Sequence, residues 1–131
     1  FNGDLAVDDL PSAWNTMFKA WFDVDVPEDR LGCLQDIHWS MGAFGYFPTY
    51  TLGNLYAAQL LEAMAADLGD IDELVASGDW EPMLAWLRPR IHERGSQVSP
   101  AQLIEDATGS PPSPEPFLRY VERKYGELYQ L

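Results

Sequence analysis

The chain has 131 residues and a formal net charge of −13, with 8 Lys and Arg against 21 Asp and Glu. An acidic surface repels the phosphates of nucleic acids and of anionic lipids, so this charge excludes an electrostatic binder of DNA, RNA or membranes. Hydrophobic residues make up 47% of the chain, which excludes a disordered polymer and predicts one domain with a core. The single cysteine, Cys33, cannot form an intramolecular disulfide and favours a reducing compartment, so we expect a cytoplasmic protein.

Helical periodicity dominates the chain. A short segment around Leu5 and Val7 is expected to be extended, and apolar residues at helical spacing then predict a helix over about residues 11–22. An irregular stretch follows over 23–49. The next helix, over about 50–68, is apolar on nearly all sides, which is typical of a helix buried on every side. In a chain this short such a helix is expected to expose apolar surface, which self-association would hide.

Four further helices are predicted from residues whose side chains can accept a backbone N–H at a helix start. These capping residues are Asp70, Asp79, Ser99 and Ser113. Pro89 should kink the helix that Asp79 begins, because proline has no N–H to donate. The sequence therefore predicts an all-α fold.

The irregular stretch holds the residues with the most chemistry. Glycines and aromatic residues surround Asp36 and His38, which are close enough in sequence for the carboxylate to orient the imidazole. Tyr46 offers a phenolic donor on the same loop. Buried polar side chains are more often hydrogen-bonded packing residues than site residues. The residues alone therefore leave open whether Asp36, His38 and Tyr46 form a functional site or are hydrogen-bonded packing residues.

Two motifs of this stretch resemble the signature of the thermostable carboxypeptidases, the Taq-type zinc metallocarboxypeptidase family. They are Gly32-x-x-Gln35-Asp36-x-His38-Trp39 and Phe44-Gly45-Tyr46-Phe47-Pro48-Thr49-Tyr50-x-Leu52-Gly53-Asn54. Upstream and downstream segments are similar to the same family, namely Asp9-Leu10-Pro11, Ile91-His92 and Phe117-Leu118-Arg119-Tyr120. The resemblance covers nearly the whole chain. It implies a helical segment of a larger fold like that of angiotensin-converting enzyme and neurolysin.

The family's metal-binding motif is missing from this sequence. In that family zinc, or another divalent metal, is held by an HExxH helix and a downstream Glu. The only comparable run here is His92-Glu93-Arg94-Gly95-Ser96, in which Ser96 replaces the second His. The resemblance therefore implies that residues 1–131 are a single C-terminal segment of a longer peptidase. The metal would bind upstream of Phe1, and this segment would bind none and be inactive alone.

The resemblance also implies the roles of the site residues. The parent would release single amino acids from the C-termini of peptides and would form a homodimer. Tyr46 would donate to the oxyanion and His38 would hydrogen-bond the substrate peptide as the catalytic pair. The substrate pocket would be formed by Gln35, Asp36, Trp39 and Tyr50. The alternative is a non-catalytic helical scaffold or oligomerisation module derived from such an enzyme.

Overall fold

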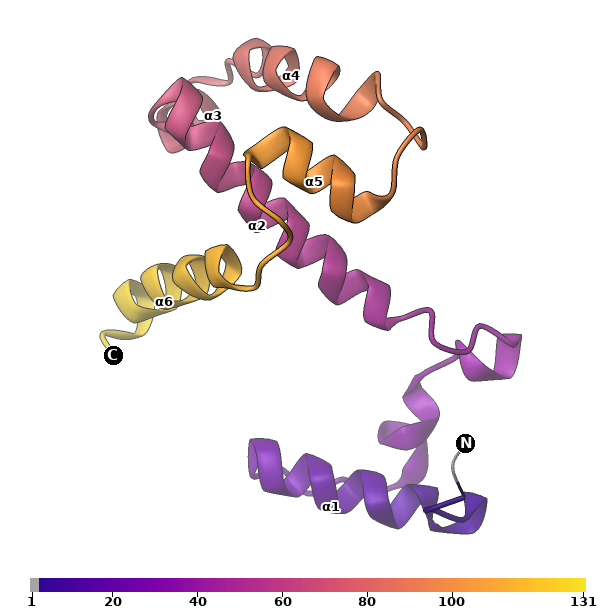
Figure 1. Cartoon of the computed structure of the whole chain (residues 1–131). Helices are drawn as coiled ribbons and strands as arrows, with labels where there is room; N and C mark the ends of the chain where they lie inside the picture. Colours follow the sequence, from indigo (N-terminus) through magenta and orange to yellow (C-terminus); the bar gives the residue numbers. More distant parts are fainter. Residues whose placement is uncertain (1–2) are drawn as a thin grey trace. The chain divides into compact units, whose positions relative to one another are not determined.

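A computed structural model describes residues 3–131 of the chain. These residues form helices and turns without any strand, which confirms the predicted all-α class. The helices belong to two compact units, Phe1–Phe47 and Pro48–Leu131 (Figure 1). Within the described range no helix has the length and apolar character needed to cross a bilayer.

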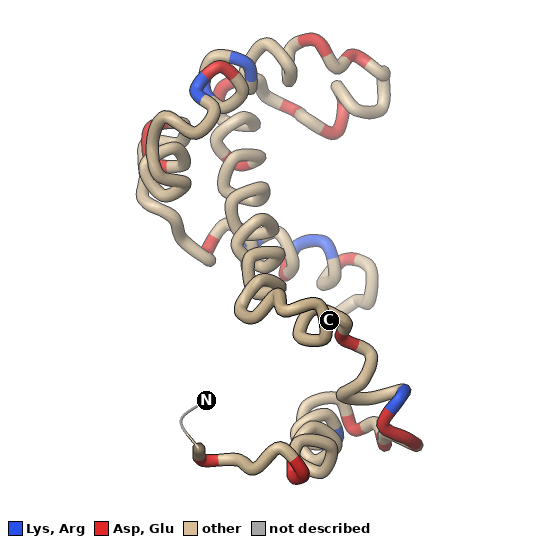
Figure 2. The backbone as a smooth tube through the Cα atoms, turned by 90° about the vertical axis from the view of Figure 1, so that its right-hand side faces the viewer, with Lys and Arg blue, Asp and Glu red and all other residues tan. Residues whose placement is uncertain are grey.

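The first unit contains one α-helix and four short turns. The 3-10 turn η1 (Val7–Asp9) leads into α1 (Leu10–Phe22), and the further 3-10 turns are η2 (Asp29–Leu31), η3 (Cys33–Gln35) and η4 (Trp39–Met41). The predicted extended segment is wrong, because the Asp9 amide donates to the Ala6 carbonyl at 3.1 Å and closes a turn. Acidic residues outnumber basic ones by 8 to 2 along this unit (Figure 2).

The first unit has a largely exposed apolar surface. Two aromatic residues of α1, Trp21 and Phe22, are 69% and 60% exposed. Among the described residues of this unit, Gly32 alone is buried. The described residues of this unit therefore form no buried hydrophobic core.

The second unit is built around one long helix, α2 (Pro48–Leu68). The other elements are α3 (Ile71–Ser77), α4 (Glu81–Leu87), the π-helical turn η5 (Arg88–His92), α5 (Pro100–Thr108) and α6 (Glu115–Tyr129). Each of α3, α4, α5 and α6 contacts α2 (Figure 1). Met64 of α2, Ile71 of α3 and Trp86 of α4 form the buried core. The first turns of α2 remain open, with Leu52 46% exposed.

Two of the predicted helix caps are confirmed. Asp70 accepts the amide of Glu73 at 3.1 Å at the start of α3, and Ser99 accepts the amide of Gln102 at 3.3 Å at the start of α5. In each case the acceptor lies three residues before the donor, so the cap needs only local sequence. Ser113 accepts the amide of Glu115 at 3.2 Å, just before α6.

The predicted cap at Asp79 is wrong. The helix α4 begins at Glu81, and the residue at its N-cap position is Trp80, which makes no side-chain cap. The backbone amide of Asp79 instead donates to the Leu74 carbonyl at 3.1 Å, while Gly78 takes the left-handed conformation that ends α3. Further along, the chain changes from α-helix to π-helix around Pro89, where the missing N–H interrupts the α-helical ladder.

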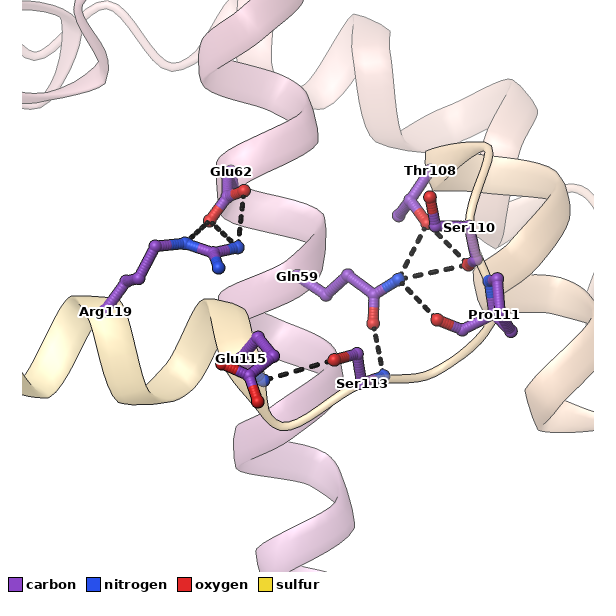
Figure 3. Close-up of polar contacts among 8 residues, drawn as sticks. All are labelled: Gln59, Glu62, Thr108, Ser110, Pro111, Ser113, Glu115 and Arg119. Carbon is purple, nitrogen blue, oxygen red and sulfur yellow. Dashed lines mark hydrogen bonds and ion pairs between the residues drawn. The ribbon is translucent and has the colours of Figure 1, made fainter.

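One buried amide joins α2 to the connection between α5 and α6 (Figure 3). Gln59 is 5% exposed, and its Nε2 lies 3.1 Å from the Thr108 hydroxyl and from the carbonyls of Ser110 and Pro111. Its Oε1 accepts the amide of Ser113 at 3.0 Å. A single side chain therefore satisfies several backbone groups of a loop that follows it by about fifty residues.

Candidate functional site

Five of the six predicted site residues lie in the first unit. Gln35 ends η3, Trp39 begins η4, and Asp36, His38 and Tyr46 lie in the turns beside them. The sixth, Tyr50, lies in the first turn of α2 and belongs to the second unit. The structure thus places the five residues of the first unit within one short segment of irregular chain.

Asp36 holds His38 through two contacts. Its Oδ1 accepts the backbone amide of His38 at 3.0 Å and also contacts Nδ1 of the imidazole. The hydrogen bonds from the His38 backbone and side chain keep the pKa of the Asp36 carboxyl below its usual value, so the carboxylate is ionised at neutral pH. A carboxylate on one ring nitrogen fixes the orientation of the imidazole.

The backbone around His38 is also fixed. The His38 carbonyl accepts the amide of Ala43 at 2.8 Å, and the Ser40 hydroxyl donates to the Ile37 carbonyl at 2.8 Å. The turn η4 ends at Gly42 with a φ of 77°, a left-handed conformation that glycine adopts without a Cβ penalty. His38 is therefore held at its amide, its carbonyl and its ring.

The loop after η4 brings aromatic rings onto His38. The centroid of the imidazole lies 5.8 Å from the Tyr46 ring and 5.9 Å from the Phe47 ring. Tyr46 is 51% exposed. A phenol and a carboxylate-held imidazole in one cluster can exchange hydrogen bonds with both the carbonyl and the amide of a peptide.

Two predicted pocket residues have local structural partners. The side-chain amide of Gln35 donates to the carbonyl of Arg30 and closes the turn before the site. The Trp39 ring packs against Phe44 with 5.5 Å between centroids. Both side chains therefore stabilise the loop that carries His38 and Tyr46.

The described residues do not fit a catalytic metal. Across residues 3–131 no group of three or more His, Cys, Asp or Glu side chains is arranged to hold a metal ion. A catalytic zinc site needs three protein ligands and an open position. The described residues therefore do not by themselves supply such a ligand set.

The second unit has a cleft of about 820 Å³ between α2, the start of α3 and α6. Its charged walls include Glu62 and Arg119, which form a bidentate ion pair at 2.9–3.2 Å (Figure 3). None of the six predicted site residues lines this cleft.

Sequence reasoning missed the parts that Gln59 and Gly32 play in the structure. Gln59 is the one polar amide within the run 55–61 of α2, which is otherwise apolar or aromatic. That isolated position could have indicated a buried amide with hydrogen-bond partners. Gly32 packs against α1 with no space for a Cβ, and no local pattern distinguishes it from a turn glycine.

Comparisons with known proteins identify the relatives of the chain. Residues 1–125 match the family model described as carboxypeptidase Taq (M32) metallopeptidase. The chain is 47% identical over 129 residues to thermostable carboxypeptidase 1 of Thermus thermophilus, covering 98% of the chain and 25% of that protein. It is 40% identical over 131 residues to carboxypeptidase 1 of Bacillus subtilis, covering 26% of that protein.

Solved structures agree with the sequence matches. The M32 carboxypeptidase of Deinococcus radiodurans R1 superposes with a TM-score of 0.93 at 38% identity, covering 98% of this chain and 26% of the other. Metallocarboxypeptidase 1 of Trypanosoma cruzi gives a TM-score of 0.90 at 38% identity, covering 95% of this chain and 26% of the other. The chain thus spans about a quarter of the length of these relatives.

Proposed function

Because this chain belongs to the carboxypeptidase Taq (M32) metallopeptidase family, we propose that it supplies the oxyanion-stabilising and substrate-binding part of a metallocarboxypeptidase site. The reaction is the release of single amino acids from the C-termini of peptides. The observation that carries the proposal is the cluster of Asp36, His38 and Tyr46, in which a carboxylate fixes an imidazole beside a phenol. The metal supplies Lewis-acid chemistry and is bound by residues from outside this chain.

Tyr46 stabilises the transition state. Attack on a peptide carbonyl places negative charge on its oxygen, and a phenolic O–H aimed at that oxygen lowers the barrier. Its half-exposed position on the loop allows the hydroxyl to meet a bound peptide. No covalent bond to Tyr46 forms in this role.

His38 binds the peptide substrate. With Nδ1 held by Asp36, the ring presents Nε2 as its other hydrogen-bonding atom. Gln35 and Trp39 hold the loop in which this pair lies, and Tyr50 contributes a further substrate contact from the start of α2. These contacts position the peptide for attack.

The proposal is tested with a chimera in which this chain replaces the matching quarter of carboxypeptidase 1 of Bacillus subtilis, which it matches over all 131 residues. In the chimera, Tyr46→Phe removes one oxyanion donor and is expected to lower kcat by about 10²-fold. The release of C-terminal amino acids from a short peptide measures this directly.

A matched tyrosine serves as the control. Tyr129 is 64% exposed and stacks on Tyr125 near the end of α6, so Tyr129→Phe also removes a phenolic hydroxyl but from a residue of the second unit that was not predicted to belong to the site. The Tyr129→Phe chimera should keep its kcat. Equal turnover in the Tyr46→Phe and Tyr129→Phe chimeras would refute the role of Tyr46, and an inactive but folded chimera would favour a non-catalytic scaffold.

Three finer properties belong to the same proposal. Zinc is the proposed metal of the parent site. A homodimer is the proposed assembly, supported by the exposed apolar residues of α1. A cytoplasmic location is proposed from the lone thiol of Cys33. Metal analysis of the chimera and light scattering test the first two, and fractionation of the source cells tests the third.

A further inference from the structure

Gly32 lies where α1 and Val26 leave no space for a side chain. A Cβ built on Gly32 would lie 2.6 Å from Cγ1 of Val26, 3.3 Å from Oδ1 of Asn15 and 3.4 Å from Cδ1 of Trp14. Trp14 and Asn15 belong to α1, so this helix packs directly against the backbone of Gly32. Carbon atoms in ordinary contact are no closer than about 3.5 Å, so any side chain at this position would push neighbouring chain away.

A short series of hydrogen bonds connects Gly32 to His38. The Gly32 carbonyl accepts the amide of Gln35 at 3.0 Å, and the side-chain amide of Gln35 donates to Arg30 on the other side of the glycine. The next residue, Asp36, holds the His38 amide and ring. A displacement of Gly32 would therefore move Gln35 and Asp36, and with them the imidazole of His38.

We propose that Gly32 is a positioning residue for His38, because its missing Cβ lets α1 and Val26 fix the turn that carries the Asp36–His38 pair. This inference rests on the proposed function for the importance of His38, but the placement itself is tested separately. Relieving a contact of 2.6 Å needs a shift of roughly 1 Å, and a misplacement of that size in a site can cost about 10²-fold in rate.

The test follows the titration of Asp36 in the whole chain by carboxyl ¹³C NMR. Hydrogen bonds from His38 hold the pKa of Asp36 down, so its titration reports whether the pair is assembled. Gly32→Ala should move the Asp36 pKa up toward the usual carboxyl value. Loss of stability alone, without movement of the pair in the folded protein, would leave this pKa unchanged.

A second substitution is expected to rescue the first. Val26→Ala removes the methyl group 2.6 Å from the new Cβ, after which the nearest atom is Oδ1 of Asn15 at 3.3 Å. The double variant should therefore return the Asp36 pKa toward its low value. Val26 is β-branched, so rotation of its side chain cannot easily provide the same relief in Gly32→Ala alone.

Gly53→Ala is the matched control, since a Cβ at this α2 position meets nothing within 4 Å. It should leave the Asp36 titration unchanged. An unchanged Asp36 pKa in folded Gly32→Ala would overturn the proposal. An Asp36 pKa that does not return toward its low value in the double variant with Val26→Ala would also overturn it, whether or not Gly32→Ala folds alone. An ordinary Asp36 pKa in the unsubstituted chain would also overturn it.

Activity in the chimera provides a second readout. Gly32→Ala should lower kcat/KM by about 10²-fold, and Val26→Ala should restore part of the loss. If Tyr46→Phe leaves turnover unchanged while the Asp36 titration responds as expected, the proposed function fails and the positioning role of Gly32 stands. The two proposals therefore fail through different measurements.

Discussion

Substitution of Gln59 by leucine removes the amide that joins α2 to the connection between α5 and α6. The two N–H groups of the Gln59 amide are shared among three acceptors, and its carbonyl takes the Ser113 amide (Figure 3). Leucine has a similar size but cannot make any of these bonds. The substitution therefore removes the polar contacts without a large change in side-chain volume.

The expected cost follows from the number of bonds. Two donated hydrogen bonds and one accepted bond contribute about 0.5–1.5 kcal/mol each, so Gln59→Leu should lower the free energy of unfolding by about 3 kcal/mol. The amide of Ser113 and the carbonyl of Pro111 would lose the Gln59 amide as their partner at a position where Gln59 itself is 5% exposed, while the Ser110 carbonyl would keep the Thr108 hydroxyl at 3.1 Å. For a domain of about 60–100 residues this corresponds to a Tm lower by about 12–24 °C.

Urea denaturation followed by circular dichroism at about 222 nm measures this loss through the helical signal. Gln97→Leu is the control, because Gln97 is an exposed glutamine in the turn before α5. The control should change stability by no more than about 0.5 kcal/mol. If Gln59→Leu changed stability as little as the control, the inference that this amide holds the loop onto α2 would be wrong.

Two further predictions concern backbone freedom and acid stability. Gly126→Ala in α6 should raise stability by about 0.5–1 kcal/mol, because a Cβ there meets nothing within 4 Å and alanine favours the helix; an unchanged or lower Tm would contradict this. The carboxyls of Asp36 and Asp106 have lowered pKa values, the latter through hydrogen bonds from Gln102 and Arg94. Both carboxyls therefore stabilise the fold above the usual carboxyl pKa, and this contribution is lost as the pH falls through the lowered values. Asp106→Asn should flatten the acid limb of a stability–pH curve, and an unchanged acid limb would refute this assignment.

Helix starts were predictable where the signal is local. Asp70 and Ser99 accept amides three residues ahead, a spacing that the sequence displays directly. Asp79 has the same residue type but a different use, because its amide completes the end of α3 before the next helix begins. A residue between two helices can complete the end of the first or cap the start of the second, and the backbone conformation between the helices decides between these two roles.

The contact between Asp36 and His38 was also predictable, because His38 follows Asp36 by two positions and the carboxylate can reach the imidazole within one turn. The meeting of His38 with Tyr46 needs the loop through Gly42, whose conformation the motif alone does not specify. The roles of these residues in catalysis remain predictions that the chimera tests.

The sequence by itself determined the all-α class and the family, because periodicity, caps and motifs are all contained within short stretches of chain. Only the tertiary structure decided the partners of Gln59, about fifty residues away, and the contact of Gly32 with α1 and Val26. Such contacts depend on how whole helices pack, and packing is fixed by the combined burial and sterics of many residues rather than by any local pattern.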